Sequence, residues 1–302
     1  MADVLIRLIR YDLCLAWNWN YDGDFAALLD AACRPRGLSL LQITPDNLAE
    51  VLRALTGGQV TFRAFLDRAS NADARFTPLV QWAREHAAYR INPQERASRT
   101  WDKAAMHLAL ITAGLYTPYS IVLPSCDEQA VLPPVMSPLG ERFTIKPAHG
   151  GGGAGVITEA TSLSQVIAAR QEYPHDRYLL QAHIVPARCD SRPAWFRVIH
   201  CAGQVYPCWW DTHTHVYAPV TPAEESGYGL APLRQVAASI AHLCGLELFS
   251  TEVALTPDGL FVVVDYVNDQ IDLRLQSRTP DGVPDDIVRD IAARLAALVA
   301  GR

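Results

Sequence analysis

Residues 143–156 read Phe-Thr-Ile-Lys-Pro-Ala-His-Gly-Gly-Gly-Gly-Ala-Gly-Val, a short strand-like run that ends in a lysine and a glycine-rich loop. Glycine lacks a Cβ atom and adopts positive φ readily, so its backbone N–H groups can approach an anion closely. Lys146 adds a point charge suited to phosphate oxygens. A flexible surface turn is the alternative, but successive glycines lose much conformational entropy on ordering, so an ordinary turn seldom needs four of them. The segment therefore predicts a phosphate-binding loop.

The residues that precede this segment alternate between strand-like and helix-like patterns. Thr44 is a good N-cap with proline after it, and Arg34-Pro35-Arg36-Gly37 is a helix stop. We predict strands over residues 4–9, 38–43 and 60–65, and helices over residues 25–33, 45–55 and 78–88. This alternation is typical of a small α/β domain with a largely parallel sheet.

The remaining chain is richer in strands. Ala202-Gly203 and Thr256-Pro257-Asp258-Gly259 mark tight turns, so the runs beside them should form hairpins. Thr100 is expected to cap a helix that Gly114 ends. Residues 124–141 read as a loop. We predict strands over residues 119–123, 142–145, 156–158, 178–184, 195–201, 204–210, 248–255 and 260–266, and helices over residues 101–113, 163–171, 232–243 and 287–300.

Acidic side chains lie on the last of these hairpins. Glu252 and Asp265 occupy its two strands, and an antiparallel pairing would bring them to one end or face. Two carboxylates with the amide oxygen of Asn268 form a hard-ligand set suited to Mg²⁺, although strand-end acids are also often simply solvated. Arg197 lies on the strand expected beside them. It could form a structural ion pair with Glu252 or hold a transferring phosphoryl group, and the sequence leaves both open.

Composition excludes several classes of protein. The 302 residues are 50% hydrophobic with a net charge of −6, enough for one large domain or two to three smaller ones. No basic stripe is present, so we expect no nucleic-acid partner. No apolar run of about 18 residues occurs, so no membrane span is expected. Seven scattered cysteines without a Cys-x-x-Cys spacing indicate reduced thiols in a cytoplasmic protein.

The order of these parts resembles the ATP-grasp superfamily. Trp-Asp-Lys at 101–103 and Ala-Gly-Leu-Tyr-Thr-Pro at 113–118 look like its central segment, and Ile-Lys-Pro at 145–147 with the following glycines looks like its phosphate-covering loop. Tyr-Leu-Leu-Gln-Ala-His-Ile at 178–184 resembles its hinge, and Phe-Arg-Val at 196–198 resembles the strand that bears a phosphate-binding arginine. The resemblance covers about residues 90–302 and, with the preceding α/β domain, extends over the whole chain.

The resemblance implies a fold and a set of roles. The fold would be α/β (α+β), with a Rossmann-like N-terminal domain over residues 1–90 and an ATP-grasp domain over residues 91–302, divided into 91–180 and 181–302. Mg²⁺ or Mn²⁺ would bind with ATP. Arg197 and Lys146 would be catalytic. The implied nucleotide-binding residues are Lys103, Lys146, His149, Gly150, Gly151, Gly152, Gly153, Gly155, Gln181, Ala182, His183, Ile184 and Asp190. The implied metal ligands are Glu252, Asp265 and Asn268.

The chain departs from the family pattern at three places. Ala182 stands where the hinge usually has an acid, and Trp195-Phe196 precede the strand arginine where an acid is frequent. The metal asparagine usually follows the last acid by two residues, but Val267 occupies that position and Asn268 comes next. Asp269 is therefore a competitor for the third ligand position.

The function implied by the resemblance is carboxylate activation. ATP would phosphorylate a small-molecule carboxylate, and an amine or thiol would attack the acylphosphate. A small-molecule kinase of the same fold and a non-catalytic nucleotide-binding protein are the alternatives. A homodimer is compatible with the sequence. Arg274 and Arg278 follow the acidic hairpin and could hold a substrate carboxylate or phosphate or lie on the surface.

Overall fold

The computed structural model describes residues 8–128 and 135–302. The first sheet has the order β2-β1-β3-β4 and its strand pairs are all parallel, as the strand–helix alternation predicts. Helices α2 and α3 bury one face of it through an apolar cluster that includes Leu55, Phe62 and Leu79. The strands are β1 (Ile9–Trp17), β2 (Leu40–Ile43), β3 (Val60–Arg68) and β4 (Tyr89–Ile91), and the helices are α1 (Gly23–Cys33), α2 (Leu48–Thr56) and α3 (Thr77–His86).

The first strand differs from its prediction. Residues 4–7 of the expected strand lie outside the described residues, and β1 runs from Ile9 to Trp17. Asp12 lies beyond the predicted strand, which ends at residue 9. In the structure its carboxylate accepts hydrogen bonds from the backbone N–H and the hydroxyl of Ser39, both at 2.8 Å. A carboxylate whose hydrogen bonds are satisfied by the neighbouring segment can lie within a strand, so β1 continues past Asp12.

Two helix starts also differ. Asn47, not Thr44, is the N-cap residue of α2, and the Asn47 side chain accepts a hydrogen bond from the Thr44 backbone N–H at 2.8 Å. Helix α5 begins at Lys103, and its cap is Asp102, which accepts from the N–H groups of Ala104 and Ala105. The predicted cap Thr100 instead ends a separate helix, α4 (Gln94–Thr100), in a polar stretch without helical periodicity.

The second sheet is antiparallel, with the order β5-β8-β6-β7. Helix α6 packs on it, and Ile145, Val166 and Tyr178 belong to their shared core. Its strands are β5 (Ser120–Leu123), β6 (Phe143–Pro147), β7 (Ile157–Ala160) and β8 (Tyr178–Ala182), accompanied by α5 (Lys103–Thr112) and α6 (Leu163–Glu172). The predicted loop 124–141 lies partly outside the described residues, and Ser137–Leu139 within it form a short 3-10 turn.

The third sheet is a five-stranded antiparallel sheet with the order β13-β12-β11-β14-β15. Both predicted hairpins form, and Ala202 and Gly203 have positive φ in the first of them. Helix α8 covers one face through Leu233, Ala237 and Ile240. Its strands are β11 (Trp195–Cys201), β12 (Gln204–Trp210), β13 (Tyr217–Pro219), β14 (Leu248–Leu255) and β15 (Phe261–Asn268), accompanied by α7 (Pro222–Gly227) and α8 (Pro232–Cys244). The short strands β9 (Arg188–Cys189) and β10 (Arg192–Pro193) form a separate two-stranded antiparallel sheet.

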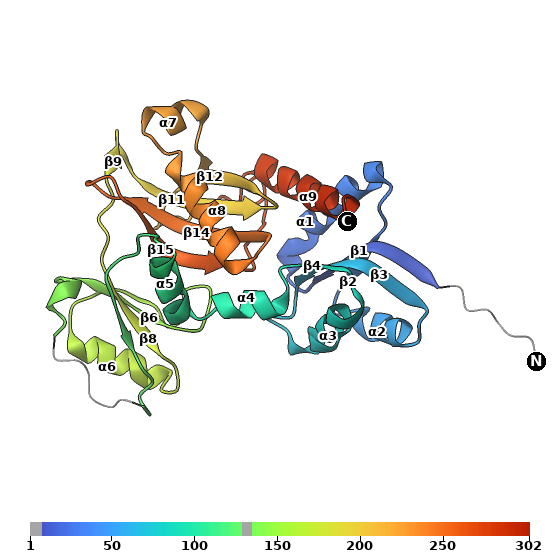
Figure 1. The fold of residues 1–302 in the computed structure, drawn as a ribbon, viewed down its shortest axis with the longest axis horizontal. Coiled ribbons are helices and arrows are strands. Elements are labelled where there is room, and N and C mark those ends of the chain that lie inside the picture. Colours follow the sequence, from blue (N-terminus) through green and yellow to red (C-terminus); the bar gives the residue numbers. More distant parts are fainter. Residues whose placement is uncertain (1–7, 129–134) are drawn as a thin grey trace, which may run out of the picture.

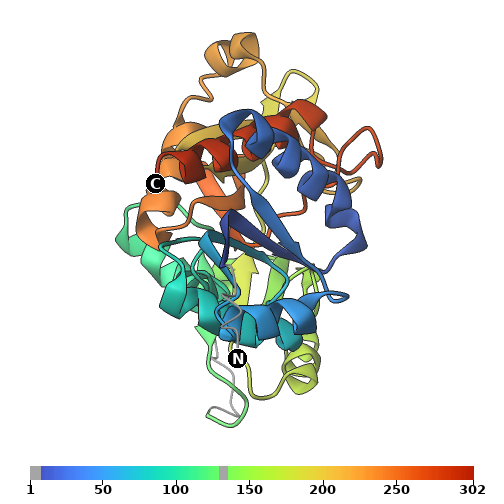
Figure 2. The same ribbon diagram turned by 90° about the vertical axis from the view of Figure 1, so that its right-hand side faces the viewer.

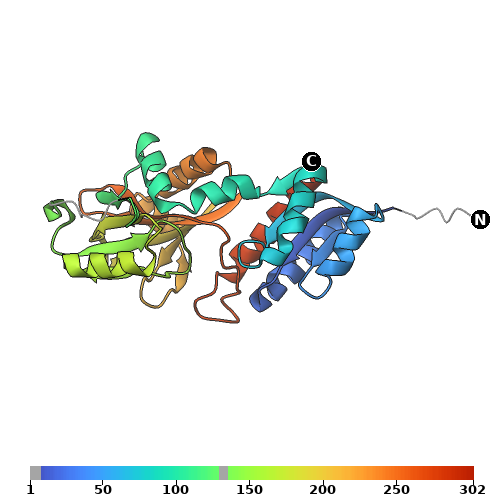
Figure 3. The same cartoon turned by 90° about the horizontal axis from the view of Figure 1, so that it is seen from below.

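The last helix joins the two ends of the chain. Helix α9 (Asp285–Ala300) packs against α1, and the two run side by side in Figures 1 and 2. Ile291 and Leu295 of α9 share one apolar cluster with Leu13 of β1 and Ile199 of β11. In Figure 3 the first sheet forms one end of an elongated molecule and the sheet carrying α6 forms the other. None of the helices in residues 8–128 and 135–302 is long and apolar enough to cross a membrane.

Candidate functional site

Three cationic side chains converge from three elements. Lys103 begins α5, Lys146 lies near the end of β6, and Arg197 lies in the middle of β11. The Lys103 ammonium donates to the carbonyl of Gly150 at 2.5 Å, and its backbone N–H donates to Ala148 at 2.8 Å. The Lys146 ammonium donates to the carbonyl of Val264 at 3.2 Å. The start of α5 is thereby tied to the glycine loop, and β6 is tied to the acid-bearing strand β15.

The predicted acidic pair forms as expected. Glu252 and Asp265 are direct partners in the antiparallel pairing of β14 and β15. Arg197 faces Glu252 on the neighbouring strand, and the two side chains form an ion pair. Trp195 Nε1 donates to the other Glu252 oxygen at 3.3 Å, and Arg197 Nε donates to Ser250 at 3.1 Å. The ion pair that the sequence allows for Arg197 is therefore present, and a contact with a phosphoryl group stays a prediction.

Asn268 reaches the same side of the sheet because β15 is irregular. The pairing runs Ser250–Asn268, Glu252–Asp265 and Val253–Val263, with a register shift at each step. In a regular strand, residues three apart point to opposite faces. A bulge changes that phase, and here Asn268 Nδ2 donates to Asp265 Oδ2 at 2.9 Å. Its competitor Asp269 is turned elsewhere, accepting a hydrogen bond from Asn92 Nδ2 at 2.5 Å.

The charges at Asp265 balance in favour of its ionised form. Burial raises the pKa of the Asp265 carboxyl, but Lys146 and Arg197 outweigh this effect and hold the pKa below its ordinary value. Lys103 acts in the same direction. Burial in turn lowers the pKa of Lys103, with Asp265 opposing that shift and Lys146 adding to it. Asp265 is therefore a buried carboxylate that interacts with three cationic side chains, Lys103, Lys146 and Arg197.

The glycine loop is held at its base. His149 donates its backbone N–H to Asp176 at 2.9 Å, and its ring Nδ1 lies 2.8 Å from the other oxygen of Asp176. Positive φ occurs at four of the predicted loop glycines, namely Gly150, Gly152, Gly153 and Gly155, whereas Gly151 has an ordinary φ. A Cβ atom at Gly155 would lie 2.8 Å from the Tyr173 ring and 3.1 Å from Pro147. Glycine is thus needed there for both conformation and space.

The predicted hinge residues lie at the end of β8 and just beyond it. The Gln181 side chain is buried, and its Nε2 donates to the carbonyl of Val264 at 3.3 Å and to the Tyr266 hydroxyl at 3.2 Å. The Ala182 N–H donates to Tyr119 at 2.8 Å. His183 is exposed and Ile184 half-buried beyond the end of β8. The side-chain amide of Gln181 therefore points toward β15 and is already bonded there.

Other predicted residues lie apart from the cationic cluster. Asp190 is in the turn between β9 and β10, where the Tyr228 hydroxyl donates to its carboxylate. Arg274 forms ion pairs with Asp272 at 2.7 Å and Asp281 at 2.8 Å. Arg278 is exposed, 3.6 Å from Asp24. None of these contacts joins them to Lys103, Lys146 or Asp265.

Sequence reasoning missed several supporting residues. Asp176 holds His149, and Asp102 both caps α5 and forms an ion pair with Arg177. Trp195 holds Glu252, at the position noted in the sequence for lacking an acid. The signal for Asp102 was present, since aspartate directly before a helical run is a preferred N-cap. The contacts of Asp176 and Trp195 join residues 27 and 57 apart and leave no local pattern.

The donor set fits a hard divalent cation. Within residues 8–128 and 135–302, no group of three or more His, Cys, Asp or Glu side chains could hold a metal ion. A metal at Glu252 and Asp265 would therefore use the Asn268 amide oxygen, together with water or phosphate oxygens. That mixed set is typical of Mg²⁺, which keeps several waters and binds through one or two carboxylates and substrate phosphates.

Comparison with solved structures identifies the fold. A RimK domain ATP-grasp protein from Sphaerobacter thermophilus DSM 20745 matches with a TM-score of 0.63 and 22% identity, over 94% of this chain and 98% of that one. The ATP-grasp ligase PsnB, solved with a minimal precursor, Mg and ADP, matches with a TM-score of 0.65 and 15% identity, over 96% and 99%. D-cycloserine synthetase DcsG matches with a TM-score of 0.59 and 18% identity, over 95% and 99%.

The sequence itself matches no protein-family model and no curated protein. The likeness is therefore one of three-dimensional structure, and it extends over nearly the whole chain. It includes both the parallel first sheet and the two antiparallel sheets that carry the cationic cluster. The chain therefore has the same overall fold as these ATP-grasp proteins.

Proposed function

We propose that this chain is an ATP- and Mg²⁺-dependent ligase that activates a carboxylate as an acylphosphate for attack by an amine or thiol. The observation that carries the proposal is the convergence of Lys103, Lys146 and Arg197 on Asp265, with Glu252 and Asn268 beside it. Phosphoryl transfer requires positioning and neutralisation of charge more than covalent help from the protein. A cluster of this composition supplies both, and the nucleotide is the ligand that the fold favours.

The two steps balance without a covalent enzyme intermediate. A carboxylate oxygen attacks the γ-phosphorus, the bond to the β–γ bridging oxygen breaks, and ADP leaves. An amine then attacks the acyl carbon, phosphate leaves with the electrons of the C–O bond, and the amine loses a proton. Thiol attack follows the same course. Mg²⁺ would neutralise developing charge on the phosphate oxygens when bound by Glu252, Asp265 and Asn268.

The residues divide the remaining work. Lys103 and Lys146 hold the phosphates, and Gly150–Gly155 close over them with backbone N–H groups. Arg197 forms an ion pair with Glu252. Glu252 would be one of the residues that hold the metal, and its attraction to Arg197 would then be weaker, so the guanidinium could contact the transferring phosphoryl group. The ribose contact of Asp190 and the adenine contacts of Gln181–Ile184 belong to the same proposal.

The test is a trapping assay. The protein is incubated with ATP, Mg²⁺ and pools of amino acids, organic acids, short peptides and polyols, with hydroxylamine present. Hydroxamate and ADP formed together support the ligase, because hydroxylamine intercepts an acylphosphate. A phosphoester without hydroxamate supports the kinase of the same fold. Binding of ATP without ADP release in every pool favours a non-catalytic nucleotide-binding protein.

A matched pair of variants controls the assay. Asp265→Asn should abolish Mg²⁺-dependent turnover while leaving the fold intact. Asp258→Asn changes an exposed acid in the turn of the same hairpin and should leave turnover unchanged. Near-normal turnover of Asp265→Asn would remove that residue from the proposed metal site.

A further inference from the structure

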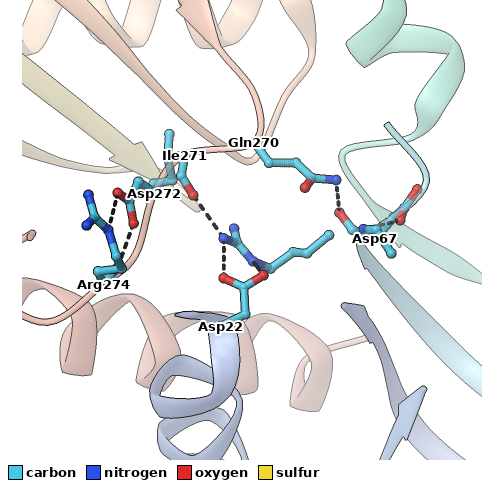
Figure 4. Close-up of polar contacts among 8 residues, drawn as sticks. Asp22, Asp67, Gln270, Ile271, Asp272 and Arg274 are labelled. Atoms are coloured by element: carbon cyan, nitrogen blue, oxygen red, sulfur yellow. Dashed lines mark hydrogen bonds and ion pairs between the residues drawn. The ribbon is translucent and has the colours of Figure 1, made fainter. Parts of the chain in front are cut away.

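The segment that follows the proposed metal ligand Asn268 is fastened to the first sheet at three successive residues. Asp269 accepts from Asn92, which follows β4. Gln270 Nε2 donates to the carbonyl of Asp67, in β3, at 3.0 Å. The carbonyl of Ile271 accepts from Arg68 Nη2 at 2.9 Å. Figure 4 shows the Gln270 and Ile271 links, with Asp67 and Asp22 on the side of the first sheet.

Arg68 is the centre of these links and is almost completely enclosed. Its side chain is 1% exposed and that of Asp22 is 3% exposed. Nε and Nη2 of Arg68 donate to the two oxygens of Asp22 at 3.1 and 2.7 Å, and the guanidinium lies 5.3 Å from the Phe25 ring centre. One planar fork therefore holds the carboxylate of Asp22 and a backbone carbonyl 203 residues away in the chain.

An ion pair of this kind contributes geometry more than stability. Removing two charges from water offsets most of their attraction, so a buried pair is weak evidence for a stabilising role. A bidentate guanidinium does fix distance and direction, because its donors are rigid relative to one another. Here the hydrogen bonds hold the backbone at Gln270 and Ile271, two and three residues after Asn268.

We propose that Arg68, held by Asp22, is a positioning residue for the metal site. By binding the carbonyl of Ile271, it fixes the position of the nearby Asn268 side chain. The inference rests on the proposed function. Asn268 stands at the end of β15, beyond the register shifts, where the ladder alone constrains it least. The three hydrogen bonds at Asp269, Gln270 and Ile271 restrict the position of the chain where the strand pairing does not. Asp265 and Glu252 lie within the paired strands and do not depend on these bonds.

The experiment measures how much Mg²⁺ strengthens the binding of ADP. Calorimetric titrations of ADP are compared in Mg²⁺ and in EDTA, and the ratio of the two affinities is the metal effect. Arg68→Lys keeps a positive charge beside Asp22 but has a single ammonium in place of the fork. We expect it to reduce the metal effect at least fivefold and to leave the EDTA affinity within twofold of the wild type, since Lys103 and Lys146 are untouched.

Two further variants keep the test decisive. Val80→Ala deletes methyl groups from the buried cluster on the other face of the first sheet, where it touches none of the three links. It should lower the thermal midpoint and keep the full metal effect. Gln270→Ala removes the second link without leaving a charge unpaired, and should reduce the metal effect about threefold even if Arg68→Lys fails to fold.

The possible outcomes distinguish a failure of the positioning role of Arg68 from a failure of the proposed ligase function. No metal effect in the wild type would overturn the proposed function and this inference with it. A normal wild-type effect that persists in Arg68→Lys, or in Gln270→Ala when Arg68→Lys does not fold, would overturn the positioning role alone. An equal loss in Val80→Ala would also overturn it, because general loosening of the first sheet would then explain the result.

Discussion

Lys146 and Lys103 are the only lysines in the chain, and both lie beside Asp265. The other cations are arginines, whose guanidinium groups are planar and more weakly hydrated than an ammonium. The scarcity of lysine could arise from composition alone. The positions of the two lysines in the fold are more informative, since both ammonium groups lie near Asp265, where the proposed phosphates would bind. Each can be removed without deleting a known structural ion pair.

Replacing Lys146 with alanine should weaken ATP binding about tenfold or more, equal to ~1.4 kcal/mol, because a charge-assisted contact to phosphate is lost. Fluorescence or calorimetric titration of ATP measures the change. Arg142→Ala provides the control, since Arg142 lies just before the same strand and forms an exposed ion pair with Glu159. Unchanged affinity in Lys146→Ala would contradict the assigned role.

Asn268 and Asp269 can be distinguished in the same way. Asn268→Ala should reduce the Mg²⁺-dependent gain in ADP affinity about tenfold, because an oxygen ligand is removed. Asp269→Asn should keep that gain, since an amide can still accept the hydrogen bond from Asn92. The reverse pattern in titrations with and without Mg²⁺ would assign the ligand to Asp269.

At the scale of elements, the hairpin of β14 and β15 was predictable because its turn fixes the pairing. Thr256-Pro257-Asp258-Gly259 closes the hairpin, and Glu252 then falls opposite Asp265. The bulged part of β15 was not predictable, since no residue type marks where a register shift occurs. Asn268 was proposed as a metal ligand from the family resemblance, and that role stays a prediction. The sequence could not show how a residue three positions after Asp265 comes to lie beside it.

The glycine loop yields a prediction about two of its members. Gly155→Ala places a Cβ atom 2.8 Å from Tyr173 at a φ of +69°, whereas Gly152→Ala, at +62°, meets open space. Both lose about 1–2 kcal/mol from the left-handed conformation, and only the first also clashes. We expect Gly155→Ala to raise KM for ATP and lower the thermal midpoint more than Gly152→Ala. Equal effects would mean that the loop reshapes freely around Gly155.

At the scale of the molecule, polar links between distant segments decide the arrangement, and these were not predictable. Asn92 bonds the backbone of Glu247 and Leu248 as well as Asp269, and Arg68 reaches Ile271. Separations of about 155 to 203 residues leave no periodic signal. The parallel first sheet was predictable because alternation of strands and helices is a local pattern. The division of the chain near residue 90 stays a prediction.

A buried histidine should make the stability of the folded protein depend on pH. Burial lowers the pKa of His200, in β11, below the ordinary histidine value of about 6.5. Below that value the unfolded chain takes up a proton that the folded chain resists, so stability falls as pH drops through the folded pKa. His200→Gln should therefore lose less stability than the wild type between pH 7.5 and 5.0 in urea unfolding. Parallel losses would contradict burial as the cause.

Asp269 should act in the opposite direction. Burial raises its pKa to about 6, from 3.8, so the folded state binds a proton more tightly than the unfolded state. Its contribution to stability improves as pH falls from about 6 toward 3.8. Asp269→Asn lacks this gain and should lose stability more steeply than the wild type over that range in the same unfolding measurements. A shallower loss would show that the carboxyl is not buried as described.

The packing of α9 against α1 has a consequence for synthesis of the chain. Leu13, Leu15 and Phe25 are made early, yet their apolar cluster is completed by Ile291, Leu295 and Val299. On the ribosome, the nascent first sheet must wait for about 200 further residues before that face is covered. Until α9 emerges, the early segment presents apolar surface of the kind that chaperones bind. We therefore expect this apolar cluster to be completed only after α9 has been synthesised.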